Sequence, residues 1–264
     1  MTQQLSMAFR AGFQWKQFSG RFQPAPPKLP EQYTQQDYLR FMREEVYRYC
    51  PRYAREKVVI DNGAVLSSMA GSGAVLAFIH YGSFFLSGGS LVHQLGLRYT
   101  AIATSRNLIP ELVSEEDIYY WRFVHRKAGM LYQHRLLHSD ENPRVPLRWL
   151  QQGGLLGIAL DVREYGQRSE ESLFDFLGRK IYLRTSVARI AKLAKVPMIP
   201  MSIQYDPVKQ SHRVQFGEPL EKVECPVAAT QTMLDGLADD PAQCPEQWFH
   251  HLSTFEKPDT GTVI

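Results

Sequence analysis

Two residues of this chain have the chemistry of a general base and of an acid that orients it. His80 comes directly after the apolar run 74–79, and Asp161 comes directly after the apolar run 155–160. Both runs are typical of buried strands, and ligands bind at the carboxyl ends of parallel strands. A histidine can take a proton from a hydroxyl nucleophile, while a carboxylate orients the imidazole and stabilises its charged form. We therefore expect both residues to face one cleft. A hydrogen-bonded core histidine and a loop-capping aspartate are the alternative interpretation.

Strands and helices alternate along most of the sequence. Apolar, β-branched runs predict strands at 74–79, 99–104, 130–133, 155–160, 198–205 and 212–216, and a hairpin at 173–183 about Gly178. Helical spacing of apolar residues predicts helices at 35–49, 83–95, 115–127, 146–152 and 186–195. This order predicts an α/β fold, an αβ sandwich with a mostly parallel central sheet flanked by helices. Residues 1–33 form a Pro-rich, irregular arm, and 34–264 form a single domain.

Composition excludes several classes of protein. The 264 residues include 30 Lys plus Arg and 27 Asp plus Glu, and a net charge of +3 is too small to predict nucleic-acid binding. The sequence has no phosphate-binding loop, no dinucleotide fingerprint and no His/Cys cluster, so we expect no bound cofactor and no metal. The three cysteines are far apart, which favours a reduced, cytosolic chain. No secretory signal begins the chain, and the uncharged stretch 63–97 is too rich in Gly and Ser to predict a transmembrane helix.

Several segments, in order, resemble the lipid A late-acyltransferase branch of the lysophospholipid acyltransferase superfamily. The matching features are a strand that ends in an acid, a Phe-Leu-Gly turn, a threonine that opens a helix, a Pro-x-x-Pro strand and a terminal segment. They fall at IALDVREYGQ (158–167), Phe176 to Gly178, Thr185, PMIP (197–200) and PEQWFHHLSTFEKP (245–258). The resemblance spans residues 63–258 and implies acyl transfer to lipid A, with His80 as the base.

One position departs from that pattern. The superfamily signature is His followed by four residues and then Asp or Glu, but Phe85 stands where the acid belongs. Phe cannot accept a hydrogen bond or balance an imidazolium charge. Asp161 is the first candidate for the missing acid, and Glu164 and Asp175 are the next.

This departure makes the chain similar to a divergent group of the branch, the lipid A glycyltransferases of polymyxin resistance. That likeness implies transfer of an aminoacyl group, glycine first, from a phosphopantetheine thioester on an aminoacyl carrier protein to a hydroxyl of lipid A. It also implies a peripheral location on the cytoplasmic face of the bacterial inner membrane. Two alternatives stay open: a late acyltransferase that moves a fatty acyl chain, and an inactive scaffold that binds lipid or carrier protein.

Lipid A carries phosphates, and arginine is suited to bind them. Each arginine by itself is equally consistent with a surface charge, but several follow predicted strands or flank the hairpin. The predicted substrate-binding set is Arg106, Arg163, Arg179 and Arg184 for anions, Glu164 and Asp175 for a donor ammonium group, and Tyr81 and Ser83 in the turn after His80.

Two aromatic and basic segments are candidates for contact with the inner membrane surface. Residues 9–22 of the arm carry five aromatic and three basic side chains, and residues 119–127 mix Tyr, Trp and Phe with Arg and Lys. For the second segment, an amphipathic helix with a buried stripe is the alternative interpretation.

Overall fold

A computed structural model describes residues 43, 45–67, 69, 71–105, 108–109, 114–162, 171–239, 247–248 and 255. Its strands are β1 (Val58–Ile60), β2 (Ala74–Phe78), β3 (Tyr99–Ala103), β4 (Leu137–His138), β5 (Leu155–Ala159), β6 (Glu171–Phe176), β7 (Arg179–Arg184), β8 (Met198–Asp206) and β9 (Ser211–Phe216). Its helices are η3 (Val46–Arg48), α3 (Pro51–Glu56), α4 (Ala64–Ser67), α5 (Phe84–Leu95), α6 (Glu115–Tyr132), α7 (Arg144–Gln151), α8 (Ser186–Ala194) and α9 (Pro226–Asp235).

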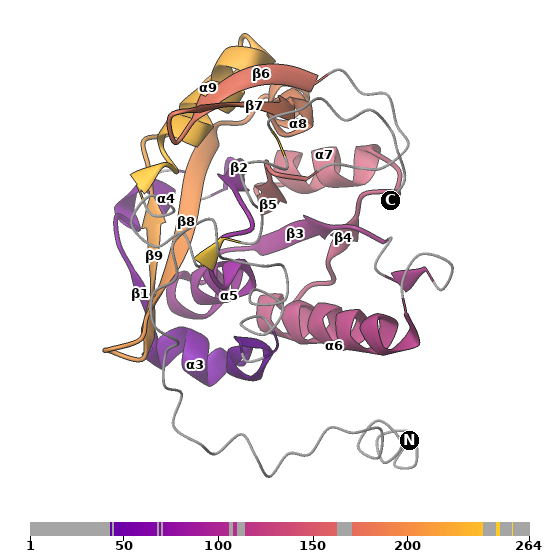
Figure 1. Cartoon of the computed structure of the whole chain (residues 1–264), viewed down its shortest axis with the longest axis vertical. Helices are drawn as coiled ribbons and strands as arrows, with labels where there is room; N and C mark the ends of the chain where they lie inside the picture. The colour runs from indigo at the N-terminus through magenta and orange to yellow at the C-terminus, as the bar shows by residue number, and fades with distance from the viewer. Residues whose placement is uncertain are drawn as a thin grey trace.

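A seven-stranded sheet in the order β1-β9-β8-β2-β5-β3-β4 forms the centre of the described residues (Figure 1). Every neighbouring pair is parallel except β8 and β9, which form an antiparallel hairpin. Strands β6 and β7 form a separate antiparallel hairpin. All five residues of β2 and all five of β5 are buried, because layers cover both faces of a parallel sheet. This arrangement confirms the predicted αβ sandwich with a mostly parallel sheet.

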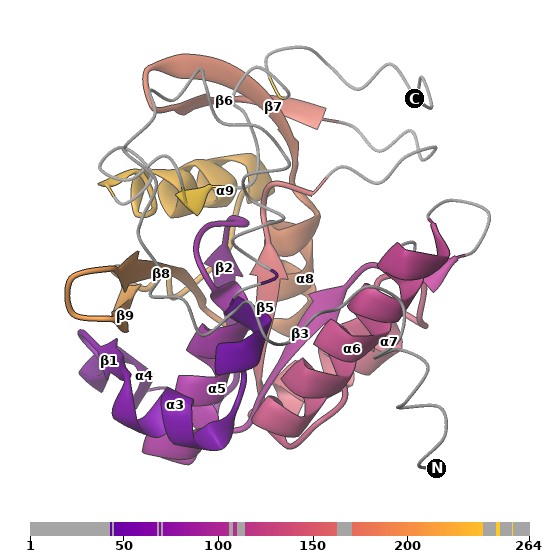
Figure 2. The same ribbon diagram turned by 60° about the horizontal axis from the view of Figure 1, so that its bottom comes forward.

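The alternation of side chains along β2 divides the core into two clusters, one on each face of the sheet. Ala74, Leu76 and Phe78 pack with residues of α3, α5 and α6, while Val75 and Ala77 pack with α7, α8, α9 and the β6–β7 hairpin. Figure 2 shows α3, α5 and α6 grouped on one side and α9 with the hairpin on the other. Gly88 lets α5 approach the sheet closely, since a Cβ there would lie 2.0 Å from the Tyr99 ring.

Most of the predicted elements agree with the structure to within a few residues. The strand predicted at 130–133 is wrong, because α6 continues through Met130 to Tyr132 and ends at Gln133, whose φ is 57°. Val124, Ala128 and Leu131 extend one helical stripe that is wholly buried, and this packing keeps the segment helical. The edge strand is instead β4, a few residues later. Helices α3, α4 and α9 and strand β1 have no counterpart among the predictions, and most of the helix predicted at 35–49 lies outside the described residues.

The aromatic segment 119–127 lies within α6. Val124 is fully buried, and Tyr120, Trp121 and Phe123 pack partly buried against the same cluster, so these side chains contribute to the core, while contact of this segment with a membrane stays a prediction. Tyr119 by contrast is 65% exposed. The arm 1–33 lies outside the described residues, and its division from a single domain at 34–264 stays a prediction. Within the described segments, no helix combines the length and the apolar character needed to span a bilayer.

Candidate active site

The register of the sheet brings His80 and Asp161 together. Strands β2 and β5 are parallel neighbours, with Phe78 opposite Ala159, and each of the two functional residues follows two positions after its member of that pair. Leu160 extends the ladder by donating its N–H to the Phe78 carbonyl at 2.7 Å. His80 Nδ1 lies 2.8 Å from Asp161 Oδ1. The predicted proximity of the two residues is therefore confirmed, while the shared cleft and the catalytic roles stay predictions.

Asp161 is almost wholly enclosed, with 1% of its surface exposed, and hydrogen bonds surround its carboxylate. The backbone N–H of His80 donates to Oδ1 at 3.0 Å and to Oδ2 at 2.9 Å. Trp248 adds its indole Nε1–H to Oδ2 at 3.0 Å. A buried carboxylate needs such donors to offset its lost hydration. Asp161 thus fixes both the backbone and the imidazole of His80.

This arrangement suits proton transfer at the imidazole. With Asp161 accepting from Nδ1–H, the lone pair of the neutral ring resides on Nε2, the nitrogen that a general base uses. The His80 side chain is 24% exposed, whereas that of Asp161 is 2% exposed, so the base meets solvent and its partner does not. The edge of the imidazole meets the Phe84 ring, with 5.0 Å between centroids, and this contact limits ring rotation.

Phe85 packs in the core instead of supplying an acid. Its side chain is 5% exposed, and its ring lies 5.6 Å from that of Tyr49 and 4.5 Å from that of Phe84. Where the superfamily signature has a carboxylate, this chain therefore has an apolar side chain that packs α5 against the segment before α3. The acid that touches His80 comes from the neighbouring strand.

The turn after β2 is held by the C-terminal segment. Gly82 donates its N–H to the Gln247 carbonyl at 2.7 Å, and Tyr81 forms a bridge with Trp248. The Gln247 side chain in turn accepts from Tyr205 N at 2.7 Å and donates to Tyr205 O at 2.9 Å. Gly82 has a φ of +56°, and a Cβ there would lie 2.0 Å from the Ile203 carbonyl oxygen, so only glycine fits. Sequence reasoning quoted the PEQW segment but gave Gln247 and Trp248 no role.

The other predicted site residues do not gather around His80 in the described structure. Asp175 and Arg179 are exposed on the β6–β7 hairpin, and Asp175 pairs with Lys180 at 2.7 Å. Arg184 is 7% exposed at the end of β7, opposite Glu171. Tyr81 is 1% exposed. Three predicted residues lie outside the described residues: Arg106, Arg163 and Glu164.

Ser83 is fully buried, and its hydroxyl donates to a carboxylate that sequence reasoning missed, that of Glu45. No motif marks Glu45 in the sequence, because its contact with Ser83 spans 38 positions.

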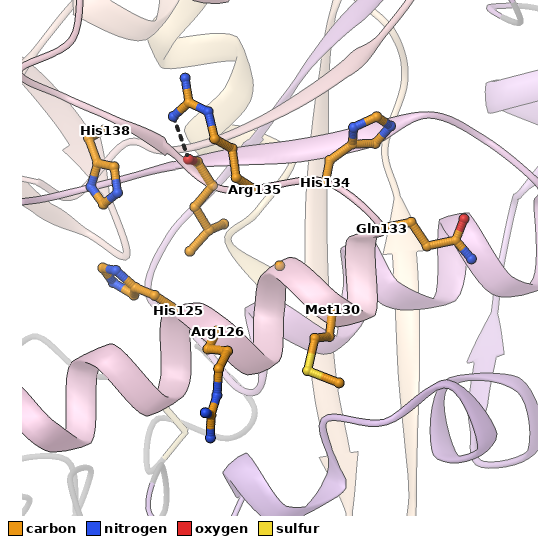
Figure 3. Close-up of a pocket in the computed structure, with 9 residues that line it drawn as sticks. His125, Arg126, Met130, Gln133, His134, Arg135 and His138 are labelled. Atoms are coloured by element: carbon orange, nitrogen blue, oxygen red, sulfur yellow. Dashed lines mark hydrogen bonds between the residues drawn. The ribbon is translucent and has the colours of Figure 1, made fainter. Parts of the chain in front are cut away.

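A surface groove of about 540 Å³ lies elsewhere, between α6 and the segment that leads into β4 (Figure 3). Its polar lining includes His125, His134 and His138, and Arg135 is engaged there with the Leu136 carbonyl at 3.2 Å and with Glu141. Among the predicted site residues that the structure describes, none lines this groove. In the part of the chain that the structure describes, no group of His, Cys, Asp or Glu side chains is placed to hold a metal ion.

A histidine in contact with a buried aspartate, at the carboxyl edge of a covered parallel sheet, is an arrangement that general-base enzymes use to activate a hydroxyl. Residues 44–257 match the family described as bacterial lipid A biosynthesis acyltransferase. The chain belongs to this family and is an acyltransferase with lipid A as its substrate. A search of curated proteins finds no match to the chain.

Proposed function

We propose that the chain transfers a small aminoacyl group, glycine first among the candidates, to a hydroxyl of lipid A and thereby gives resistance to cationic peptides such as polymyxin. The proposed donor is a phosphopantetheine thioester on an aminoacyl carrier protein. The proposed location is peripheral, on the cytoplasmic face of the inner membrane. The observation that supports this proposal best is the relocation of the acid from the Phe85 position to the enclosed Asp161.

The physical reason concerns the charge of the donor. A glycyl thioester carries an ammonium group, which an accessible carboxylate beside the base would hold in an unproductive ion pair. Asp161 is 1% exposed, and the hydrogen bonds that it accepts from His80 and Trp248 already occupy its oxygens. It can orient the imidazole without attracting the ammonium group. At the Phe85 position, the site presents no charge at all.

In the proposed reaction, the acyl group moves from the thioester sulfur of the donor to a hydroxyl oxygen of lipid A. The lipid A hydroxyl oxygen attacks the thioester carbonyl as His80 Nε2 takes the hydroxyl proton. The tetrahedral intermediate then expels the thiolate, which receives that proton from the imidazolium, and an ester and a free thiol result. Asp161 stabilises the imidazolium through Nδ1. General-base catalysis of this kind contributes about 10²- to 10⁴-fold in rate.

A fatty acyl donor is the second candidate, and one observation favours it. The rings of Phe78 and Phe84 stack at 5.4 Å beside His80, and an acyl chain could lie against such an apolar wall. Both rings are less than a tenth exposed, however, which leaves little surface for a chain. The inactive scaffold was suggested by the missing acid, and the His80–Asp161 contact removes that reason for it.

The deciding experiment gives the purified enzyme lipid A and an equal mixture of glycyl-loaded and lauroyl-loaded carrier protein. Mass spectrometry of the lipid product then identifies the transferred group. The proposal expects glycyl-lipid A in at least tenfold excess. The His80→Ala variant serves as the control for uncatalysed transfer. Use of the lauroyl donor alone would establish the late-acyltransferase alternative instead.

A further inference from the structure

A second buried carboxylate touches the turn that follows His80. Glu45 is fully buried just before η3, and its Oε2 accepts a hydrogen bond from the hydroxyl of Ser83. The guanidinium of Arg48 pairs with Oε1, and His212 Nε2 lies 2.9 Å from Oε2. A buried ion pair of this kind is weak evidence for stability, because apolar residues of equal volume would often serve as well. Stability alone therefore does not explain why this ion pair lies beside the candidate active site.

The charges in this cluster are fixed near neutral pH. Burial, with a smaller contribution from Arg48, lowers the pKa of His212 to about 3, so this imidazole is neutral. Burial raises the pKa of Tyr53 to about 12, and its hydroxyl, 3.2 Å from His212 Nδ1, stays protonated. Arg48 also donates to the Tyr205 hydroxyl at 3.1 Å. Among the described residues of this network, the ion pair is thus that of Glu45 with Arg48.

Ser83 connects this cluster to the base. It is the N-cap residue of α5, yet its side chain makes no capping hydrogen bond to the helix, because its hydroxyl is directed to Glu45. Its carbonyl accepts from Leu86 N at 2.7 Å, which fixes the first turn. The next residue, Phe84, places its ring against the edge of the His80 imidazole. A shift of Ser83 would therefore move the ring that supports His80.

The first turn of α5 also lacks an acidic residue of its own. Negative charge near a helix N-terminus is stabilising, because the first N–H groups of the helix point toward it. The Glu45 carboxylate supplies this charge from a segment 38 positions earlier in the chain, through the residue that caps the helix.

We propose that Glu45 is a positioning residue for His80. It holds Ser83 and the first turn of α5, and Phe84 passes this restraint to the imidazole. Two residues then share the functions of the acid in the superfamily signature. Asp161 orients the imidazole of His80 by direct contact, and Glu45 fixes the turn that follows His80. The inference rests on the proposed role of His80 as the general base.

Two variants separate positioning from simple stability. Glu45→Gln keeps the shape of the side chain and removes its charge, while Ser83→Ala removes the link and keeps the pair of Glu45 with Arg48. The matched control is Tyr53→Phe, which alters the far side of the same cluster without touching Ser83. We expect kcat to fall about tenfold in both test variants, with KM within twofold of wild type, and the double variant to be no worse than Glu45→Gln alone. Tyr53→Phe should keep kcat within twofold.

A measurement without substrate distinguishes failure of this inference from failure of the proposed function. The imidazole Cε1–H resonance of His80 should be single and narrow in the wild type and in Tyr53→Phe, and should broaden or split in Ser83→Ala. The transfer assay is run with the glycyl-loaded and the lauroyl-loaded carrier protein, so the donor identity does not decide the result. If Glu45→Gln does not fold, Ser83→Ala carries the test by itself. A folded Ser83→Ala protein with wild-type kcat and an unchanged His80 resonance would overturn the proposal.

Discussion

Two buried carboxylates reach the turn after β2, and they differ in what they touch. Asp161 contacts His80 itself, through backbone N–H and Nδ1, and the added donor is the neutral indole of Trp248. Glu45 contacts Ser83 instead, and its partner in charge is Arg48. The first carboxylate is therefore placed to act on the charge that develops on the base, whereas the second is placed to act on where the base lies.

If Asp161 and Glu45 have the roles proposed for them, the acid of a sequence motif can be lost while its two effects are kept. The end of β5 would then supply orientation and charge stabilisation, and a residue before η3 would supply negative charge at the start of α5. Phe85 can then pack in the core between Phe84 and Tyr49.

The largest effects should come from the His80–Asp161 contact. His80→Ala should lower kcat about 10²- to 10⁴-fold, because His80 is the proposed acceptor of the hydroxyl proton. Asp161→Asn should come close to this loss. Its amide NH2 would face donors that now point at a carboxylate, so the unfolding free energy should also fall by about 1–3 kcal/mol. Steady-state transfer kinetics and denaturant unfolding check both. Near-normal turnover in Asp161→Asn would reject it as the orienting acid.

Restoration of the signature acid should harm the protein. Phe85→Asp places a charge among Tyr49 and Phe84 and leaves a void, so we expect a loss of about 3–5 kcal/mol in unfolding free energy and no gain in turnover. The apolar control Phe85→Leu should lose roughly 1–2 kcal/mol. Denaturant titration followed by tryptophan fluorescence measures both. A more active Phe85→Asp enzyme would mean that Asp161 does not replace the lost acid.

His212, a member of the Glu45 cluster, should make the stability of the protein depend on pH. The pKa of His212 is about 3 in the folded chain, and the ordinary value near 6.5 applies when the chain unfolds. The unfolded state binds more protons between these values, so stability falls as pH falls through this window. From pH 7 to pH 5, His212 alone should lower the free energy of unfolding by about 2 kcal/mol.

The total loss of stability from pH 7 to pH 5 should be smaller in His212→Gln than in the wild type, by about 2 kcal/mol. His125, whose pKa is lowered to about 4 by burial and by His138, contributes equally to both proteins, so it cancels in the difference. Identical pH dependence in wild type and His212→Gln would show that His212 is not held neutral.

The smallest effect should come from the outer support of Asp161. Trp248→Phe removes one hydrogen bond to the carboxylate but keeps an aromatic ring against Phe176, whose centroid lies 5.7 Å from that of Trp248. We expect kcat to fall about three- to tenfold, in line with the net contribution of one typical hydrogen bond. KM should stay the same, because Trp248 acts through Asp161. A change confined to KM would place Trp248 at a substrate instead.

The sequence by itself determined the elements that the site needs. Apolar runs marked β2 and β5, and both are buried over their whole length. A strand end directly before His80 and another before Asp161 were enough to predict one shared edge, because parallel strands present their carboxyl ends together. The same patterns failed at 130–133, where a helical stripe and a short strand look alike over four residues. They also missed α3, α4, α9 and β1.

Only the tertiary structure decided which acid meets the base and what holds the turn. Three acids were candidates on the sequence. The register of β2 against β5 places Asp161 against His80, Asp175 is paired with Lys180 on the hairpin, and Glu164 lies outside the described residues. Glu45 and Trp248 reach the site across 38 and 87 positions respectively. Periodicity and spacing describe a chain's nearest neighbours, and contacts over such separations exist only after the sheet and its covering helices have packed.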